Sequence, residues 1–369
     1  GKVDASTGKD MSTQILSGHI GMLLRPDARN VLVIGLASGV TVGSVEQWPS
    51  VRHLVVAEIS PAVVRSERWF DPFNHDALHD PRVHLVIDDG RHYLNVTHRS
   101  FQVVISEPSN PWESGPARLF TRQFFALVRA HLRPDGVYVQ WVPLYGLSTS
   151  LLKAEVRTFL SVFPHVVMLK VSAGDLLLVG GRQPLVPRAH PPLPSAVSAD
   201  LARVHSSRWD LLARFVGSTS GLRVWVGPGR FNTDDNGLLE FGAPRYLLVP
   251  TLEANIHSLR RIPWRAGLAR WGKDAPLRLA RALLRHGALR RAAFLARRAP
   301  PGAASWTLEG DIAARRRYWV TAANLWRRAG TAPAELHLAA LEFSDPRCSA
   351  PPRHSPTSPP MATPLTIIT

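Results

Sequence analysis

Five short apolar runs alternate with helix-like segments between residues 30 and 142, and this alternation restricts the fold more than any other feature of the sequence. We expect the apolar runs to be strands, and they lie at residues 31–34, 54–57, 83–87, 102–106 and 136–142. The segments between them carry turn and helix signals, such as a proline at a position that suits the first turn of a helix, Pro61. Strands that alternate with helices predict a parallel sheet with helices on both faces.

Two further apolar runs follow this repeat. Residues 166–171 and 175–179 are separated only by Ser172, Ala173 and Gly174, so we predict an antiparallel hairpin. A parallel sheet that ends in such a hairpin resembles the S-adenosylmethionine-dependent methyltransferase fold. We therefore predict an α/β, Rossmann-like domain of this kind, followed by a basic α-helical region.

Composition and pattern divide the chain into six parts. We expect an N-terminal segment at 1–28 that contributes to the substrate site, the nucleoside-binding α/β domain at 29–182, a proline-rich linker at 183–198, an accessory segment near the active site at 199–258, a basic helical region at 259–344 and a disordered tail at 345–369.

Three of these parts carry further structural predictions. The N-terminal segment contains a predicted helix at 11–24, and the accessory segment contains a predicted strand at 222–226. Residues 306–317 and 318–329 resemble the antiparallel helix pair of a helical-repeat protein.

The net charge of +16 is concentrated in one region, residues 260–328. A basic helical surface could bind nucleic acid, an acidic partner or an anionic membrane face. The alternative, which we favour, is that these arginines lie on solvated helix faces, because no groove-reading or stacking motif accompanies the charge.

Several features bear on where the protein works. No apolar run approaches the roughly 20 residues that a membrane-spanning helix needs, and no signal-peptide pattern is visible. The one cysteine, Cys348, excludes an internal disulfide. We expect a cytoplasmic protein.

The fourth predicted strand ends on a carboxylate, Glu107, which is followed by Pro108 and Pro111. In α/β sheets the carboxyl ends of the strands form the ligand-binding edge. The two prolines restrict the backbone beside Glu107. Glu107 is therefore the candidate for the chemistry.

Three other strand ends carry ligand-binding signals. A small-residue turn at 35–39 follows the first strand and opens a helix, so its backbone amides can face a ligand. Glu58, at the end of the second strand, is placed to bind ribose hydroxyls. Asp89 and Gly90, after the third strand, could bind an adenine amino group. Each position alone also fits a structural role, but together they indicate an adenine-nucleoside site.

The succession of Val31–Gly35, Glu58, Asp80–Val83, Asp88–Arg91 and Glu107–Pro111 resembles the spermidine synthase (polyamine aminopropyltransferase) family, and most closely its bacterial spermidine-synthase-like branch. The resemblance covers about residues 1–250. It implies that decarboxylated S-adenosylmethionine donates an aminopropyl group to an amine, with no metal ion.

The resemblance also implies roles for single residues. Glu107 falls where the family has its proton-accepting aspartate. The donor would be bound by Gly35, Ser38, Gly39, Glu58, Asp89, Gly90 and Pro116, and the amine by Asp4, Gln14, Asn110 and Gln140. The family has aspartates in place of Ser38 and Asn110 and a histidine in place of Gln14. Its members are usually oligomeric, which makes a homodimer one expectation.

Residues beyond the family motifs could complete the acceptor site. Tyr145 could form a wall of the pocket, although it fits a core position equally well. Asp234, Asp235 and Glu240 could add negative charge if the accessory segment folds over the sheet edge. The alternative is a helix cap formed by Thr233 or Asp234.

Other functions remain open as alternatives. An enzyme of this fold could be a methyltransferase that uses intact S-adenosylmethionine. A catalytically inactive nucleoside-binding protein, docking through its basic helices, is the other alternative. No metal site is expected, because the histidines at 75, 79, 84, 92 and 98 lack ligand spacing. Serine-hydrolase and phosphate-loop motifs are absent from the sequence.

Overall fold

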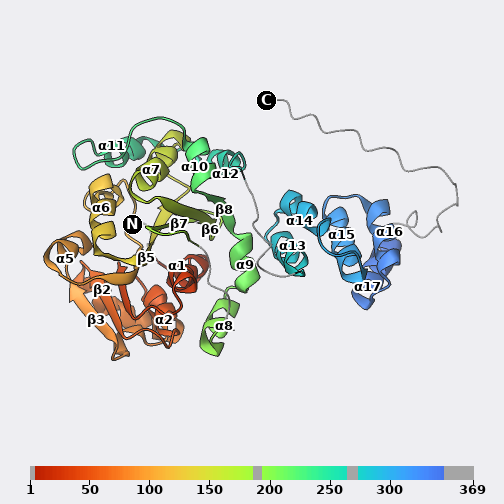
Figure 1. The fold of residues 1–369 in the computed structure, drawn as a ribbon, viewed down its shortest axis with the longest axis horizontal. Helices are drawn as coiled ribbons and strands as arrows, with labels where there is room; N and C mark the ends of the chain where they lie inside the picture. The colour runs from red at the N-terminus through yellow and green to blue at the C-terminus, as the bar shows by residue number, and fades with distance from the viewer. Residues whose placement is uncertain (1–4, 186–192, 264–272, 345–369) are drawn as a thin grey trace. The chain divides into compact units, whose positions relative to one another are not determined.

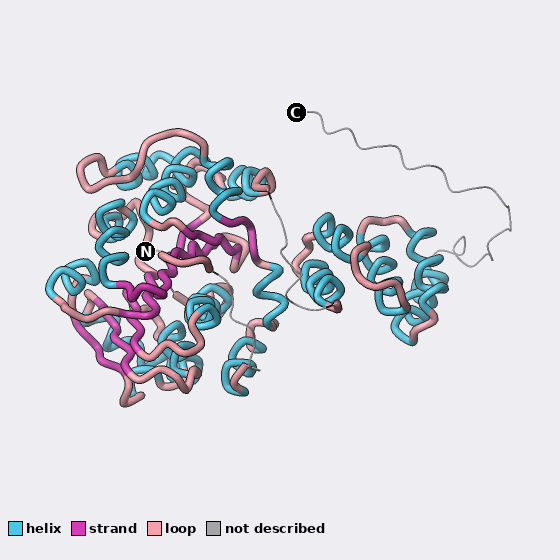
Figure 2. Tube along the Cα trace, viewed as in Figure 1, coloured by secondary structure: helices cyan, strands magenta, loops and turns pink. Residues whose placement is uncertain are grey.

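The computed structural model describes residues 5–185, 193–263 and 273–344 and divides the chain into two units, residues 1–267 and 268–369. Figure 1 shows that the first unit is built around one sheet with helices on both sides. The strands in magenta all belong to this unit, whereas the described part of the second unit consists of helices and turns (Figure 2).

The sheet has eight strands in the order β3-β2-β1-β4-β5-β7-β6-β8. Strands β1 to β5 pair with one another in parallel. Beyond β5 the pairing is antiparallel: β7 pairs with β5, β6 pairs with β7, and β8 pairs with β6. The predicted parallel sheet with an antiparallel hairpin is therefore confirmed. The strands are β1 (Asn30–Ile34), β2 (His53–Glu58), β3 (Val83–Ile87), β4 (Phe101–Ser106), β5 (Leu132–Pro143), β6 (His165–Lys170), β7 (Asp175–Gly181) and β8 (Phe215–Ser218).

Helices cover both faces of the sheet. One face packs against α5, α6, α7, α10 and α12, and the other packs against α1, α2, α8 and α9. The α-helices of this unit are α1 (Met11–Leu24), α2 (Val40–Glu46), α3 (Pro61–Glu67), α4 (Asp71–Asn74), α5 (Gly90–Val96), α6 (Arg122–His131), α7 (Thr149–Val162), α8 (Ser195–Ala202), α9 (Arg208–Ala213), α10 (Thr219–Val226), α11 (Leu238–Gly242) and α12 (Leu252–Leu259). Four 3₁₀ helices complete it: η1 (Arg68–Phe70), η2 (Ala77–His79), η3 (Pro116–Phe120) and η4 (Ala243–Tyr246).

Strand β1 shows why the strands are apolar throughout. Val31 and Val33 face the side with α1 and α2, while Leu32 and Ile34 face the other side. Successive side chains of a strand point to opposite faces, and here both faces are buried. An unbroken apolar run is the pattern that this environment requires.

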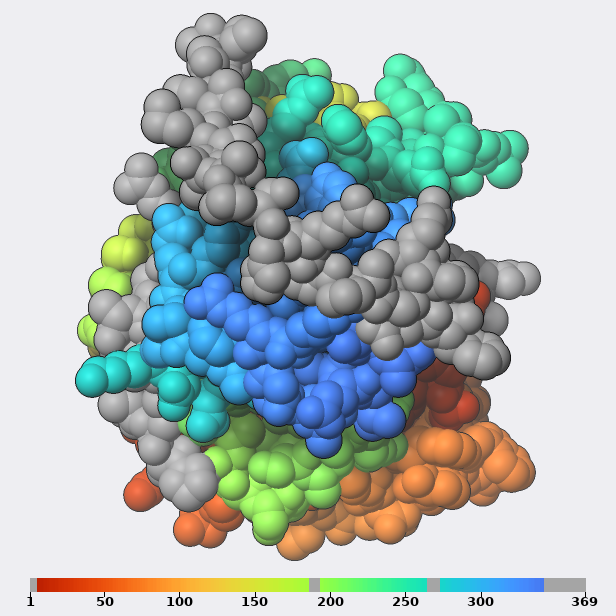
Figure 3. Space-filling model, turned by 90° about the vertical axis from the view of Figure 1, so that its right-hand side faces the viewer, coloured from red at the N-terminus to blue at the C-terminus, as the bar shows by residue number. Residues whose placement is uncertain are grey.

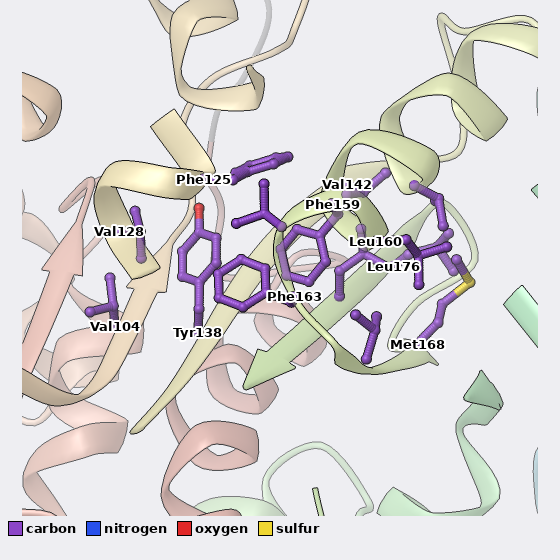
Figure 4. Packing of buried hydrophobic residues seen from close by; sticks show 14 of the residues in the cluster. Val104, Phe125, Val128, Tyr138, Val142, Phe159, Leu160, Phe163, Met168 and Leu176 are labelled. Atoms are coloured by element: carbon purple, nitrogen blue, oxygen red, sulfur yellow. The ribbon is translucent and has the colours of Figure 1, made fainter. Parts of the chain in front are cut away.

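A cluster of aromatic rings anchors β5 to the helices beside it. In Figure 4 the rings of Phe125, Tyr138, Phe159 and Phe163 lie close together. The ring centroids of Phe159 and Phe163 are 4.7 Å apart, and those of Phe125 and Phe159 are 5.1 Å apart in an edge-to-face contact. Such pairs stabilise a core beyond the area that they bury. The cluster thus fixes α6 and α7 against the sheet.

The prediction of a strand at residues 222–226 is wrong, because these residues end helix α10. Leu222, Trp225 and Val226 are buried, while Val224 is 73% exposed. This spacing fits one face of a helix rather than the alternation of a strand. The strand in this segment is β8, which pairs with β6 and precedes α10.

The second unit contains five described helices: α13 (Ala275–Arg285), α14 (Leu289–Ala296), α15 (Ala303–Arg315), α16 (Trp319–Ala329) and α17 (Ala332–Ser344). The blue helices α15 to α17 lie side by side and form a continuous surface in Figure 3. Gly310 permits close packing of α15 and α16, since a Cβ atom there would lie 2.4 Å from Nε1 of Trp326. The helix pair predicted at 306–329 corresponds to α15 and α16.

None of the helices among the described residues is both long enough and apolar enough to cross a bilayer. The tail at 345–369 and residues 186–192 of the predicted linker lie outside the described residues, and so does Asp4. Helix α8 begins at Ser195, inside the segment expected to be a linker.

Candidate active site

A cavity of about 560 Å³ lies at the carboxyl ends of the first four strands. Its lining includes a residue at the end of each of these strands or within two positions after it: Gly35, Glu58, Asp89 and Glu107. This is the edge at which α/β sheets bind ligands. Four predicted site residues that lie far apart in the sequence are therefore brought together.

The glycine turn allows β1 and β4 to approach each other at this edge. Gly35 has a φ of +95°, and a Cβ atom on it would lie 2.7 Å from the carbonyl oxygen of Glu107. A side chain there would force the two strand ends apart. Gly39, with a φ of +75°, precedes α2 and does not line the cavity.

Glu58 is held in a fixed position by two backbone amides. Its Oε2 accepts a hydrogen bond from Leu36 N at 2.9 Å, and its Oε1 accepts one from Ser60 N at 2.8 Å. A carboxylate has about four acceptor sites in total. Glu58 can therefore accept further hydrogen bonds from vicinal hydroxyls of a ligand.

Asp89 and Gly90 connect β3 to α5 at the cavity wall. Oδ1 of Asp89 accepts hydrogen bonds from Arg91 N at 2.7 Å and His92 N at 3.2 Å, so this carboxylate caps the helix. Gly90 lets α5 pack closely on β1, because a Cβ atom there would lie 2.4 Å from Cγ2 of Ile34. Pro116, from the predicted donor set, also lines the cavity.

Gln14 and Ser38 form one buried unit beside the cavity. Gln14 lines it, whereas the fully buried Ser38 does not. The hydroxyl of Ser38 donates a short hydrogen bond to Oε1 of Gln14, and Nε2 of Gln14 donates to the Ser6 carbonyl at 3.1 Å. Ser38 thus orients Gln14 and does not reach a ligand directly.

Glu107 lines the cavity and is held by two hydroxyl groups. The Ser17 hydroxyl donates to Oε1 at 2.8 Å, and the Thr41 hydroxyl makes a short contact with Oε2. Burial raises the pKa of Glu107 to about 7, although the hydrogen bonds from Thr41 and Ser17 partly oppose this, and the nearby Asp175 adds to it. A pKa near neutrality suits a group that must accept and release a proton.

The hydrogen bonds of Thr41 depend on the protonation state of Glu107. The Thr41 hydroxyl also lies 3.0 Å from the Gln14 carbonyl oxygen, which can only accept. The single hydroxyl hydrogen cannot serve both oxygens fully. With Glu107 protonated, Glu107 donates to Thr41, and Thr41 donates to the Gln14 carbonyl. With Glu107 ionised, Thr41 turns its hydrogen toward the carboxylate.

Two carboxylates that the sequence reasoning missed also line the cavity, Asp10 and Asp175. Asp175 accepts hydrogen bonds from the hydroxyls of Thr13 and Ser172 and from Nε1 of Trp141, the latter at 3.1 Å. Asp10 accepts from the Ser6 hydroxyl at 2.8 Å. Asp10 precedes a helix and Asp175 opens a hairpin strand, so in the sequence each one looks like an ordinary capping or turn residue.

Asn110 and Tyr145 complete the wall around this part of the cavity. Asn110 is fully buried, and its amide donates to Oε1 of Glu113 at 2.7 Å. The ring of Tyr145 packs edge to face on Trp112, with 6.0 Å between centroids. Tyr145 is therefore both a packed aromatic and part of the cavity wall.

Three other predicted residues do not line this cavity. Gln140 is fully buried, where it accepts a short hydrogen bond from the Tyr138 hydroxyl and donates to the Trp141 carbonyl. Asp234 forms an ion pair with Arg91, with Nη1 2.8 Å from Oδ1, and lines a separate cavity of about 440 Å³. Asp235 is exposed and lines neither cavity.

The first cavity has a strongly acidic lining. Among the described residues its wall contains five carboxylates and no lysine, arginine or histidine: Asp10, Glu58, Asp89, Glu107 and Asp175. Low-dielectric walls that carry one sign of charge concentrate ligands of the opposite sign. The arrangement therefore favours a cationic ligand.

In the described part of the chain, one group places metal-ligand atoms within 4.8 Å of one another: Asp71, Asp76 and His79. Asp76 and His79 are exposed, and none of the three lines the acidic cavity. The group provides no argument for a metal centre at the candidate active site.

Comparison with known proteins finds similarity to polyamine-forming aminopropyltransferases over part of the chain. Residues 12–173 match the family model of the spermine/spermidine synthase domain. The polyamine aminopropyltransferase of Synechococcus sp. (strain JA-2-3B'a(2-13)) is 36% identical over 171 residues, which cover 44% of this chain and 55% of the relative. That of Thermoanaerobacter sp. (strain X514) is 34% identical over 147 residues, covering 40% and 52%. The chain thus spans about half the length of these curated relatives.

A solved structure gives a weaker similarity. The spermidine synthase from Thermotoga maritima has 19% sequence identity and a TM-score of 0.46, covering 66% of this chain and 75% of that chain.

Proposed function

We propose that this chain, whose residues 12–173 match the spermine/spermidine synthase domain, transfers an aminopropyl group from decarboxylated S-adenosylmethionine to an amine. The observation that carries the proposal is the acidic cavity, whose described lining residues include five carboxylates and no cationic side chain. Both proposed substrates are cations, and both would be attracted to such a site.

The same observation argues for the decarboxylated donor. Intact S-adenosylmethionine carries a carboxylate, and the cavity has no cationic side chain among its described lining residues to neutralise it. The decarboxylated form replaces this anion with hydrogen and keeps an ammonium group. The lining charges therefore support aminopropyl transfer over a methyltransferase reaction.

The nucleoside part of the donor fits the strand ends. We assign the ribose hydroxyls to Glu58, whose carboxylate is fixed by Leu36 N and Ser60 N. The adenine is assigned to the wall formed by Asp89, Gly90 and Pro116. This leaves the part of the cavity near Glu107 for the aminopropyl group and the acceptor.

The proposed reaction is a direct displacement. Glu107 removes one proton from the acceptor ammonium, and the free nitrogen attacks the aminopropyl carbon next to the sulfonium. The carbon–sulfur bond breaks with its electron pair going to sulfur, which yields methylthioadenosine. The new secondary amine leaves as an ammonium ion. Because the sulfonium is a good leaving group, positioning of the two substrates supplies much of the rate.

Calorimetric titration with decarboxylated S-adenosylmethionine, intact S-adenosylmethionine and methylthioadenosine tests the proposal. We expect the decarboxylated donor and methylthioadenosine to bind at least tenfold more tightly than the intact donor. Preference for the intact donor would instead support a methyltransferase. Failure of all three compounds to bind would overturn the enzyme assignment and leave the non-catalytic alternative.

A second experiment tests the role of Glu107. In an assay of methylthioadenosine release with a diamine acceptor, we expect Glu107→Gln to lower kcat at least 100-fold, the range that a general base supplies. Donor affinity should change little. If the variant keeps wild-type turnover, Glu107 is not the base.

A further inference from the structure

The helices α13 to α16 of the second unit form two copies of one helix pair. Helices α13 and α15 each end on an arginine, Arg285 and Arg315, and these lie 30 positions apart (315 minus 285). Each connecting turn has a left-handed residue at the same place, with a φ of +71° at Gly287 and +65° at Arg317. Helices α14 and α16 then begin at equivalent positions. The two pairs are therefore consecutive helical repeats.

Stacking of the repeats brings their connecting turns to the same edge of the second unit. Helix α14 packs against α13 and α15, and α13 also packs against α15. Packed helices lie about 8–10 Å apart, so the two turns are neighbours. We call the exposed basic residues in and beside these turns the basic edge: Arg285, His286, Arg290, Arg315, Arg316 and Arg317.

The second unit supplies few anions to offset this charge. Residues 273–344 contain 13 lysines and arginines against 5 aspartates and glutamates, a net charge of +8, and no carboxylate side chain occurs in 275–308 or 312–334. Within the described residues, Arg315, Arg316 and Arg317 form no ion pair. A concentration of positive charge of this kind attracts a polyanion.

Two exposed aromatic rings adjoin the basic edge. Tyr318 is 54% exposed and Trp319 is 41% exposed. The guanidinium carbon of Arg316 lies 5.1 Å from the centroid of the Tyr318 ring. Nucleic acid bases stack both on aromatic rings and on guanidinium planes. The sequence shows no stacking motif beside its arginines, but the fold exposes two rings next to three of them.

We propose that the basic edge, together with Tyr318 and Trp319, binds single-stranded nucleic acid. The arginines bind phosphates and the two rings stack on bases. The charges lie on turns rather than along one helix, which argues against a helix that reads the major groove of a duplex. An acidic peptide would use the arginines but has no bases to stack on the rings. This binding is independent of the proposed aminopropyl transfer.

Fluorescence anisotropy with the full chain tests the proposal, using labelled oligo(dT) and oligo(rU) of about 20 nucleotides. At physiological salt we expect a Kd of roughly 1–100 µM, the range of sequence-independent binding. Replacing Arg315, Arg316 and Arg317 together with alanine should raise Kd about tenfold or more. The slope of log Kd against log salt should fall by about 2, because each phosphate contact with a single strand contributes about 0.7.

A matched control removes three exposed arginines from the first unit, Arg52, Arg99 and Arg245, by substitution with alanine. This control should leave Kd within twofold and the salt dependence unchanged. A double variant, Tyr318→Leu with Trp319→Leu, keeps apolar side chains but removes both rings. It should weaken oligonucleotide binding about fivefold or more, the effect of losing one base stack. Circular dichroism checks that each variant is folded.

Other anionic partners are tested beside the oligonucleotides, with polyglutamate of similar length and with vesicles that contain phosphatidylserine. Polyglutamate that competes equally well, with no effect of the leucine variant, would identify an acidic protein partner and overturn the proposal. Binding to the vesicles but not to the oligonucleotides would overturn it in favour of a membrane surface. Equal loss of binding in the matched control would show that the charge of the whole chain is responsible. Absence of oligonucleotide binding at about 50 mM salt would show that the arginines are simply solvated.

Discussion

His19 of α1 and Asp200 of α8 form a buried contact, with Nε2 of His19 2.9 Å from Oδ2 of Asp200. Nε1 of Trp48 donates to Nδ1 of His19 at 3.0 Å, so this nitrogen carries no proton. Nε2 must therefore carry the hydrogen, and it donates to Asp200. The contact ties α8 to the helix whose Ser17 and Thr13 hydroxyls hydrogen-bond to the cavity carboxylates Glu107 and Asp175.

We expect Asp200→Asn to destabilise the protein by about 3 kcal/mol, because removal of one partner from a buried polar network leaves the others unpaired. Asp200 also accepts hydrogen bonds from Ser44 at 2.6 Å and from Arg203 at 2.7 Å. Urea unfolding followed by circular dichroism measures the change, with Asp235→Asn, at an exposed aspartate that lines neither cavity, as the control. A loss below 0.5 kcal/mol, about the effect of an ordinary surface substitution, would show that the network adds little to stability.

The pH dependence of turnover should reveal the state of Glu107. Because burial raises the pKa of Glu107 to about 7 and a base must be ionised, kcat/KM should rise tenfold per pH unit below about 7 and level off above it. Thr41→Val removes a hydrogen bond that lowers this pKa, so the midpoint should move to higher pH. A profile that is flat between pH 5.5 and 8 would exclude Glu107 as the titrating base.

The half of the cavity that we propose binds the nucleoside could be predicted from the sequence, because its candidate residues lie at or just after the ends of apolar strands. Glu58, Asp89 and Glu107 all follow that rule and all line the cavity. The alternation of strands and helices sets the edge at which they meet.

The proposed acceptor half of the cavity depends on long-range contacts that no local sequence pattern predicts. Asp175 lies 68 positions after Glu107 along the chain (175 minus 107) and reaches the cavity only because β7 pairs antiparallel with β5. Asp10 looks like a helix cap in the sequence, yet its side chain caps no backbone amide. Gln140 was assigned by resemblance, but it is fully buried and hydrogen-bonds to Tyr138 and to the backbone of Trp141.

Glu58→Gln should weaken the binding of methylthioadenosine by about 10- to 100-fold, the range expected for a lost hydrogen bond to a charged group. The amide nitrogen of glutamine would also face one of the two backbone amides that now donate to the carboxylate, Leu36 N or Ser60 N. Calorimetric titration gives the Kd directly. Unchanged affinity in a folded variant would show that the ribose hydroxyls bind elsewhere.

Glu155 of α7 is a fully buried carboxyl whose two oxygens have no hydrogen-bond partner among the described residues. Burial raises the pKa of Glu155 well above its usual range, so the folded chain keeps this group protonated. The unfolded chain releases the proton near pH 4.3. The stability contributed by the neutral form is thus complete below that pH and is lost as the pH rises toward the raised pKa of the folded state.

We therefore expect Glu155→Met to stabilise the protein by about 2 kcal/mol at pH 8, because methionine fills a similar volume without an unpaired polar group. The gain should be smaller at pH 5.5, where ionisation of the unfolded chain contributes less. Glu155→Gln is the matched control: it removes the titrating carboxyl but keeps a buried polar group, so it should reduce the pH dependence of stability without the full gain in stability.

Some pH dependence of stability should remain in both variants, because the pKa of Glu46 is also raised, to about 8. Urea unfolding at the two pH values measures these differences, and a Glu155→Met variant that is less stable than wild type at both would show that the carboxyl has a stabilising partner.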